Sequence, residues 1–168
     1  TIQSNANKKN SQLIKINNKE IKNKRYYKKD KIWSFDFRDY NGISLGNLRG
    51  EFQIKNAAIA ITALEVLNKK NLVKINQNNV KNWLKNAKWP GRFEFLDKNL
   101  LIDCAHNPDG FKVLFNELKN LDYKRLVLVL GFSNDKDVKT ISKIINQNKK
   151  IKKIILTQAK SERAMDAD

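Results

Sequence analysis

The feature that most constrains the fold is a regular succession of short strands and helices that follows Trp89-Pro90-Gly91. The expected order is strand, strand, helix, strand, helix and strand, at residues 93–96, 100–103, 108–121, 125–130, 137–146 and 154–156. Strands that alternate with helices predict a doubly wound sheet with right-handed crossovers. We therefore expect an α/β fold whose second part is a Rossmann-like, mostly parallel sheet domain.

Trp89-Pro90-Gly91 also predicts a domain boundary. Pro90 disfavours helical backbone at Trp89, and Gly91 permits backbone angles that other residues avoid. We expect one domain in residues 1–88 and another in residues 89–168. The last expected strand lies so near the end of the chain that we expect the second sheet, like the first domain, to be incomplete.

Residues 1 to about 50 read as short strands and turns. Residues 33–37 alternate between apolar and polar types, which predicts a half-buried strand. Asn41-Gly42 predicts a hairpin turn that leads to a strand at residues 43–45. A weaker alternation at residues 12–16 indicates another strand, and a disordered basic tail is the alternative for residues 1–10.

Two helices are expected before the boundary. Residues 51–68 are apolar nearly all round, which predicts a buried helix. Residues 76–87 predict a shorter helix with Val80, Trp83 and Leu84 on one face. In the second domain, the continuous apolar run at residues 125–130 is typical of a strand buried on both faces.

The formal net charge is +17 in 168 residues, which is the usual signature of a nucleic-acid-binding protein. Here, however, lysine dominates over arginine and recurs with asparagine along the whole chain, which indicates a compositional bias and no localised patch. A basic nucleic-acid-binding module stays the alternative. No apolar run is long enough to span a bilayer. The single cysteine, Cys104, rules out an internal disulfide and suits a reducing cytoplasm.

One candidate site follows the strand at residues 100–103. Asp103 ends this strand just before a helix N-terminus, where ligands collect in open α/β sheets and where N–H groups favour anions. His106, the only histidine, could donate to a carboxylate or a phosphate when protonated. Spacing alone leaves open whether Asp103 and Asn107 bind a ligand or merely cap the helix.

Three further segments are candidates. Arg92 could neutralise a polyphosphate across a domain cleft, although spacing alone favours a solvated linker. Asn56 offers the donor and acceptor groups that an adenine edge needs, although an N-cap is individually more probable. The loop at residues 131–137 follows the central strand and reads as mostly structural. The glycines cannot form a Gly-x-x-x-x-Gly-Lys-Ser/Thr phosphate loop, and no Cys/His cluster for zinc or Ser–His–Asp arrangement is present.

Taken in order, these segments resemble the Mur ligase superfamily, and most closely folylpolyglutamate synthase and dihydrofolate synthase. That family carries Gly-x-His-Gln-x-x-Asn-Ala, then Pro-Gly-Arg, then Asp-Gly-Ala-His-Asn-Pro, then Gly-x-x-x-Asp-Lys-Asp. The matching segments here are residues 50–57, 90–92, 103–108 and 131–137. Residues 161–164 resemble the Pro-Arg-Ala type segment that follows the next strand in relatives. Each motif alone is modest, but four in the right order are highly specific.

The resemblance implies an ATP-dependent ligase that adds L-glutamate to a folate or a dihydropteroate through an acyl phosphate. Residues 1–88 would be the end of the central ATPase domain, and residues 89–168 would be most of the C-terminal domain. Asn56, Arg92 and Asp103 would contact ATP at the adenine, the phosphates and the ribose, and His106 would lie near the nucleotide or the incoming glutamate. The ligands for Mg²⁺ are expected upstream, so this chain alone should not catalyse amide formation.

The resemblance also implies a monomeric cytoplasmic parent enzyme with no specific nucleic-acid partner and no membrane. Two residues depart from the family pattern. Phe52 stands where the family has His, so a polar contact beside the nucleotide is lost. Cys104 stands where the family has Gly, which is tolerable if its backbone angles are ordinary. Another Mur-type ligase, acting on a cell-wall precursor, is a close alternative.

Overall fold

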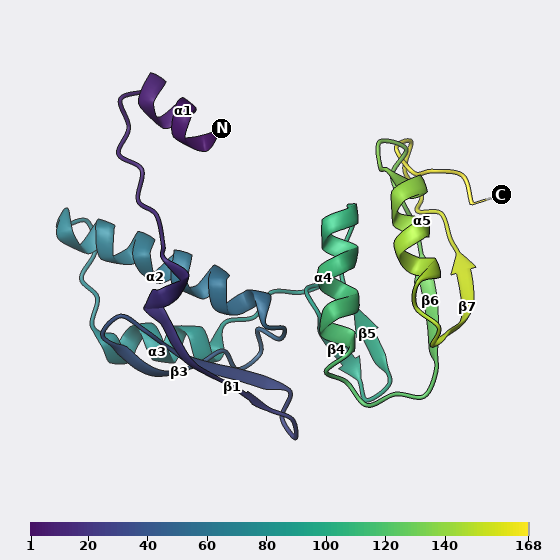
Figure 1. Cartoon of the computed structure of the whole chain (residues 1–168), viewed down its shortest axis with the longest axis horizontal. Helices are drawn as coiled ribbons and strands as arrows, with labels where there is room; N and C mark the ends of the chain where they lie inside the picture. Colours follow the sequence, from purple (N-terminus) through teal and green to yellow (C-terminus); the bar gives the residue numbers. More distant parts are fainter. Residues whose placement is uncertain (168) are drawn as a thin grey trace. The chain divides into compact units, whose positions relative to one another are not determined.

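The computed structural model describes residues 1–167, which form two compact units, one of residues 1–88 and one that begins at Trp89. The first unit contains α1 (Ile2–Lys8), η1 (Asn18–Glu20), β1 (Ile21–Tyr27), β2 (Ile32–Phe37), β3 (Tyr40–Ser44), α2 (Phe52–Lys69) and α3 (Gln77–Asn86). The second unit contains β4 (Glu94–Asp97), β5 (Leu100–Ile102), α4 (Pro108–Leu118), β6 (Leu126–Leu130), α5 (Val138–Asn146) and β7 (Ile151–Leu156) (Figure 1). The expected α/β class is confirmed.

The first sheet has the order β1-β2-β3 and is antiparallel throughout. The hairpin that joins β2 to β3 is confirmed, but the turn predicted at Asn41-Gly42 is wrong. The chain turns at residues 38–39, and Asn41 and Gly42 lie within β3 opposite Asp36, where the register shifts. Two features of Arg38 stabilise the turn at residues 38–39. Its backbone is left-handed (φ 51°), and its guanidinium pairs with Glu20 and Glu65.

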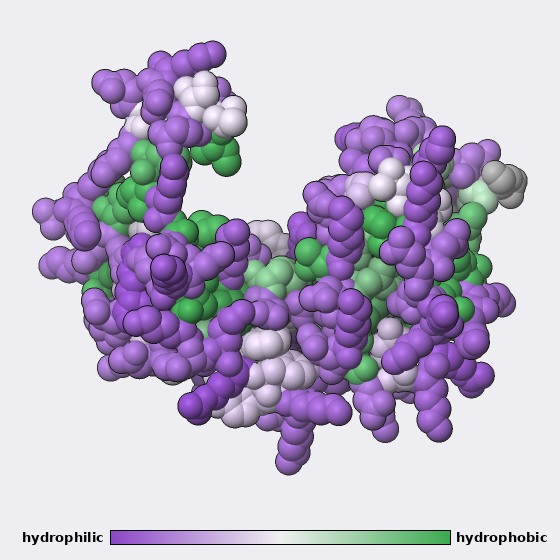
Figure 2. Space-filling view, in the orientation of Figure 1, coloured by the Kyte–Doolittle hydropathy of each residue, from purple (hydrophilic) through white to green (hydrophobic). Residues whose placement is uncertain are grey.

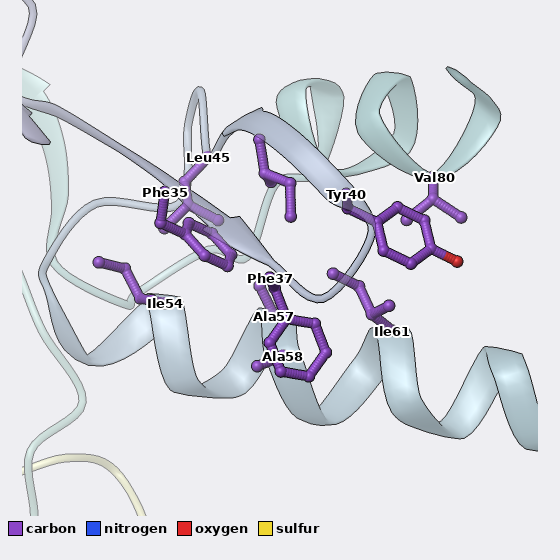
Figure 3. Packing of buried hydrophobic residues seen from close by; sticks show 10 residues of the cluster. Phe35, Phe37, Tyr40, Leu45, Ile54, Ala57, Ala58, Ile61 and Val80 are labelled. Atoms are coloured by element: carbon purple, nitrogen blue, oxygen red, sulfur yellow. The ribbon is translucent and has the colours of Figure 1, made fainter. Parts of the chain in front are cut away.

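The core of the first unit lies between this sheet and one face of α2 (Figure 3). Phe35 and Phe37 extend from β2 toward the helix, Phe35 near Ile54 and Phe37 near Ala58, and all four are buried. The expectation that α2 is buried all round is wrong, because Ile59 is 51% exposed on its other face. The buried face of α2 shares one core with the three-stranded sheet and with Val80 of α3.

Two other expectations for the first unit need correction. Residues 2–8 form a helix with no buried residue, where strands or a disordered tail were expected. Residues 11–17 form no strand, so the weak alternation at residues 12–16 carried no structural information. The helix expected at residues 76–87 is confirmed as α3. Val80 is buried there, but Trp83, which was expected on the same face, is exposed.

The second unit has the expected order of elements. β4 and β5 form an antiparallel hairpin, as their short connection dictates, and β6 pairs with β7 in parallel across α5. Among residues 1–167, no strand ladder joins these two pairs. The expectation that the strand at residues 125–130 is buried on both faces is wrong, because Val127 and Val129 are exposed. A continuous apolar run does not distinguish a strand covered on one face from a strand covered on both.

Candidate functional site

The loop that carries Pro90-Gly91-Arg92 and the loop that follows β5 are held together by backbone hydrogen bonds. The Cys104 N–H donates to the Gly91 carbonyl (2.8 Å), and the Phe93 N–H donates to Asp103 Oδ2 (2.8 Å). Asp103 Oδ1 accepts the N–H of Ala105 (2.8 Å). The two sequence motifs of the second unit therefore form one structure, which we call the loop pair (residues 90–93 and 103–107).

Asp103 is half-buried and has a structural role in the loop pair, since each carboxylate oxygen accepts one backbone N–H. It does not cap α4; that role belongs to Asn107, whose Oδ1 accepts the Gly110 N–H (2.7 Å), with Pro108 at the first helical position. A carboxylate has about four acceptor sites, so these bonds leave Asp103 able to accept from a ligand hydroxyl as well. The contact between Asp103 and ATP remains a prediction.

Arg92 is exposed at the tip of the loop pair, between two residues with left-handed backbone. Gly91 has φ +73°, and Phe93 has φ 47° with its ring buried against Phe95. A bulky residue in this region costs about 1–2 kcal/mol, so the surroundings must hold Phe93 there. Phe93 is held in this conformation by burial of its ring and by the hydrogen bond from its N–H to the Asp103 carboxylate. The chain reverses direction here, and the Arg92 side chain is exposed to solvent.

Cys104 packs directly on Gly91. A Cβ at Gly91 would lie 2.7 Å from Cys104 Sγ, and Gly91 also has the positive φ that favours glycine. Cys104 itself does not have a positive φ, so its side chain lies at a position with ordinary backbone angles. The departure from the family's glycine is therefore accommodated, and the resulting contact makes Gly91 harder to replace.

His106 is exposed on the same loop as Asp103. Its Nδ1 lies 2.9 Å from the Cys104 carbonyl oxygen, which makes Nδ1 the protonated nitrogen. Nε2 then accepts a hydrogen bond in the neutral ring and donates one when the ring is protonated. The predicted contact of His106 with a nucleotide or glutamate is compatible with this geometry and stays a prediction.

Asn56 belongs to the first unit, on an exposed part of α2. The N-cap interpretation is wrong, because α2 begins at Phe52 with Glu51 before it. Asn56 Nδ2 instead donates to Oε1 of the buried Gln53 (2.9 Å), which fixes the orientation of the Asn56 amide. Phe52, the residue that departs from the family's His, packs its ring against Gly50, where a Cβ would lie 2.4 Å from the ring.

The loop at residues 131–137 is tied to the segment that resembles the family's Pro-Arg-Ala element. Ser133 forms a bridge with Ala164, and the Asn134 N–H donates to the Arg163 carbonyl (2.9 Å). Asp135 pairs with Lys136 (2.6 Å), and this hydrogen bond lowers the pKa of the Asp135 carboxyl. Asp137 caps α5 by accepting the Thr140 N–H, so the mostly structural interpretation of this loop agrees with its contacts.

Sequence reasoning missed two contributors. Glu94, in β4, accepts the Gly91 N–H through Oε2 (2.7 Å), and Gln53 orients Asn56. Neither residue type is distinctive at its position, and the Glu94 contact depends on the left-handed backbone of Gly91 and Phe93. The described part of the chain brings together no group of three or more His, Cys, Asp or Glu residues that could hold a metal ion. No helix in residues 1–167 is long and apolar enough to cross a membrane.

Residues 91–168 match the family model of the Mur ligase, glutamate ligase domain. The chain is 35% identical over 92 residues to folylpolyglutamate synthase of Lacticaseibacillus casei, which covers 54% of this chain and 22% of that protein. It is 33% identical over 100 residues to the dihydrofolate synthase/folylpolyglutamate synthase of Bacillus subtilis, covering 58% of this chain and 23% of that protein. Over these stretches the chain is therefore similar to this group of ligases.

The same fold occurs in a solved structure of Mycobacterium tuberculosis folylpolyglutamate synthase in complex with ADP. The TM-score is 0.81 and the identity is 24%, over 98% of this chain and 37% of that protein. The chain thus spans about a quarter of the two curated relatives and a little over a third of the solved one. Both units described above are included in that structural match.

Proposed function

On the premise that residues 91–168 belong to the Mur ligase, glutamate ligase domain family, we propose that this chain supplies part of an ATP site. The ligase to which the site belongs adds L-glutamate to a folate or a dihydropteroate. One observation carries the proposal: the loop pair presents an exposed arginine and a carboxylate with free acceptor sites, on a backbone that is fixed at several points. Exposed guanidinium groups suit phosphate oxygens, with which they form charge-assisted, often bidentate hydrogen bonds.

Each candidate residue has a separate part in this proposal. Arg92 neutralises the nucleotide phosphates, and Asp103 uses its remaining acceptor sites for the ribose hydroxyls. Asn56, held by Gln53, contacts the adenine. His106 donates from Nε2 to an anionic group of the nucleotide or of glutamate when its ring is protonated. These assignments follow the motif positions, and the conformations of Arg92 and Asp103 support them.

The proposed reaction has two steps. A carboxylate oxygen of the folate or dihydropteroate attacks the γ-phosphorus of ATP, which forms an acyl phosphate and releases ADP. The amino nitrogen of glutamate then attacks the acyl carbon, so that the amide bond forms, phosphate leaves and the nitrogen loses its proton. Arg92 contributes charge stabilisation where negative charge develops on the phosphates. Among the described residues, no group of three or more His, Cys, Asp or Glu side chains could hold the Mg²⁺ that the resemblance implies.

An activity assay tests this proposal. In the protein that carries this chain, ADP release should require both glutamate and a folate or dihydropteroate acceptor. The Arg92→Ala variant should lower the turnover with ATP by about a hundredfold, because removal of one donor that stabilises developing charge costs that much. Activity with a cell-wall precursor and none with folates would replace this substrate assignment by that of another Mur-type ligase.

The basic net charge favours one other candidate, a nucleic-acid-binding module. A titration of labelled RNA separates the two. A polyanion attracted only by scattered lysines should bind weakly at physiological salt. Tight RNA binding whose affinity falls steeply with salt would support the module, because such a slope counts the counterions that localised contacts release.

A further inference from the structure

We propose that Glu94 is a positioning residue, which holds the loop pair so that Arg92 is oriented toward the nucleotide phosphates. The inference rests on the proposed ATP site and adds a residue to it. Glu94 lies in β4, is half-buried, and has its backbone in register with Ile102 of β5. Its side chain turns back along the chain, and Oε2 accepts the N–H of Gly91 (2.7 Å).

The backbone around Arg92 is held on both sides. Before Arg92, the Gly91 N–H is bound by Glu94 and the Gly91 carbonyl by the Cys104 N–H. After Arg92, the Phe93 N–H is bound by Asp103. By contrast, the N–H of Arg92 itself has only a long contact of 3.4 Å to the Trp89 carbonyl. The direction of the Arg92 side chain therefore depends on two hydrogen bonds in which a backbone N–H donates to a carboxylate. The Gly91 N–H donates to Glu94, and the Phe93 N–H donates to Asp103.

Both bonds restrain residues that have a left-handed backbone. Gly91 and Phe93 have φ of +73° and 47°, and Gly91 can leave this region easily because glycine adopts negative φ about as readily as positive φ. Hydrogen bonds to a charged acceptor are about twice as strong as neutral ones, so Glu94 is a strong restraint on Gly91. Without Glu94, Gly91 can leave the left-handed region, and Arg92 loses its fixed direction. A preorganised arginine binds phosphate better than a mobile one, because less entropy is lost on binding.

The test compares ADP binding and amide protection in variants of the chain, followed by ¹H–¹⁵N NMR, which detects weak binding. Glu94→Ala should raise the ADP dissociation constant by about fivefold to tenfold, which is within the range of one ordinary hydrogen bond. Glu94→Gln should stay within about twofold of the natural chain, because its amide carbonyl can accept the same N–H. In Glu94→Ala, the Gly91 amide should exchange its hydrogen faster.

Asp97→Ala is the matched control, since Asp97 ends the same strand, is exposed, and carries the same charge. It should change ADP binding by less than about twofold, since distant exposed charges are screened by salt. Arg92→Ala should weaken ADP binding, and the double variant Arg92→Ala/Glu94→Ala should be no weaker than Arg92→Ala alone. That lack of additivity is the signature of a residue that acts through another.

Each outcome decides between the two proposals. If Arg92→Ala weakens ADP binding and Glu94→Ala does not, the role of Glu94 is overturned and the ATP site survives. If Glu94→Ala weakens binding equally with and without Arg92, Glu94 acts on the ligand directly, which also overturns the positioning role. If Arg92→Ala leaves binding unchanged, the phosphate contact is wrong and the inference about Glu94 fails with it. Unaltered exchange at Gly91 in Glu94→Ala contradicts the hydrogen bond itself.

Discussion

The two units differ in how completely they cover their apolar side chains. In the first unit, ten buried residues from β2, β3, α2, α3 and the loop after β3 form one continuous core. In the second, as far as residue 167, the buried residues are Phe93 and residues of α4 and α5, while apolar residues of every strand are exposed. Figure 2 shows that apolar patches interrupt a mostly hydrophilic surface.

The difference indicates that local hydrogen bonds and helix caps hold much of the second unit in its fold. The loop pair is fixed by Asp103 and Glu94, α4 by its Asn107 cap, and α5 by its Asp137 cap. In the first unit, by contrast, side-chain packing across the sheet and α2 supplies the stability. Substitutions in the first core should therefore cost more than substitutions of strand residues in the second unit, and polar substitutions should matter most in the loop pair.

The largest effect should come from Ile61→Ala in α2. Ile61 is fully buried, and truncation of a buried isoleucine to alanine costs about 2–5 kcal/mol through lost burial and the cavity that remains. Chemical denaturation monitored by hydrogen exchange of residues 32–62 measures it. Ile59→Ala, in the same helix but 51% exposed, is the control and should cost less than about 1 kcal/mol. Equal costs for both would mean that the outer face of α2 is also covered.

The next effect should come from Asp103→Ala, which removes the acceptor for both the Phe93 and the Ala105 N–H groups. The loss should destabilise the second unit by about 2–3 kcal/mol, since hydrogen bonds to a charged acceptor are worth that much. Asp103→Asn keeps one carbonyl acceptor and should recover about half of the loss. Thermal unfolding with local exchange data measures both, and an unchanged melting temperature in Asp103→Ala would show that the loop pair is held by other contacts.

A third effect concerns acid stability in the first unit. The Asn23 side chain and the Gly42 N–H donate to Asp36, and these hydrogen bonds lower the pKa of its carboxyl. The stabilisation that Asp36 contributes is therefore complete above the ordinary Asp pKa of about 3.9. It is lost as the pH falls through the lower pKa of the folded state. Asp36→Asn should flatten the loss of stability of residues 21–45 below that pH. An acid profile identical to that of the natural chain would rule out Asp36 as its source.

The smallest effect should come from Val129→Ala in β6. Val129 is 64% exposed, so its truncation should change stability by no more than about 0.5 kcal/mol. The matched substitution in the first unit, Val80→Ala, removes a buried side chain and should cost about 1–2 kcal/mol. The difference between the two valines measures the contrast between the units directly. A cost at Val129 as large as at Val80 would show that this face of β6 is covered in solution.

Much of this fold could be predicted from local patterns. The order of elements beyond Gly91 and the cap at Asn107 follow from apolar runs and from Asn-Pro chemistry, which depend on neighbouring residues alone. The turn at Arg38 could not be predicted, because its ion pairs with Glu20 and Glu65 join residues far apart in the sequence. The exposed faces of α2 and β6 could not be predicted either, since an apolar pattern does not state how many layers cover it.

The candidate site was predictable in a different way. Arg92, Asp103 and His106 could be picked out by their place in ordered motifs, because the Pro-Gly break and the strand end are local features. Their union into one loop pair depends on the left-handed backbone of Phe93, a conformation that no sequence pattern indicates for a bulky aromatic residue. The role of Glu94 could not be predicted for the same reason, since its hydrogen bond to Gly91 depends on that backbone geometry.

The most direct test of the central claim, that the loop pair binds nucleotide phosphates, is an NMR titration of this chain with ADP and, separately, with adenosine. The amide signals of residues 91–93 should shift with ADP and far less with adenosine, because only ADP carries phosphates for Arg92, whereas adenosine still offers its ribose to Asp103. The ADP-induced shifts at residues 91–93 should vanish in Arg92→Ala. Shifts that spread over the lysine-rich surface and spare residues 91–93, or shifts at residues 91–93 that are equal with ADP and adenosine, would contradict the account.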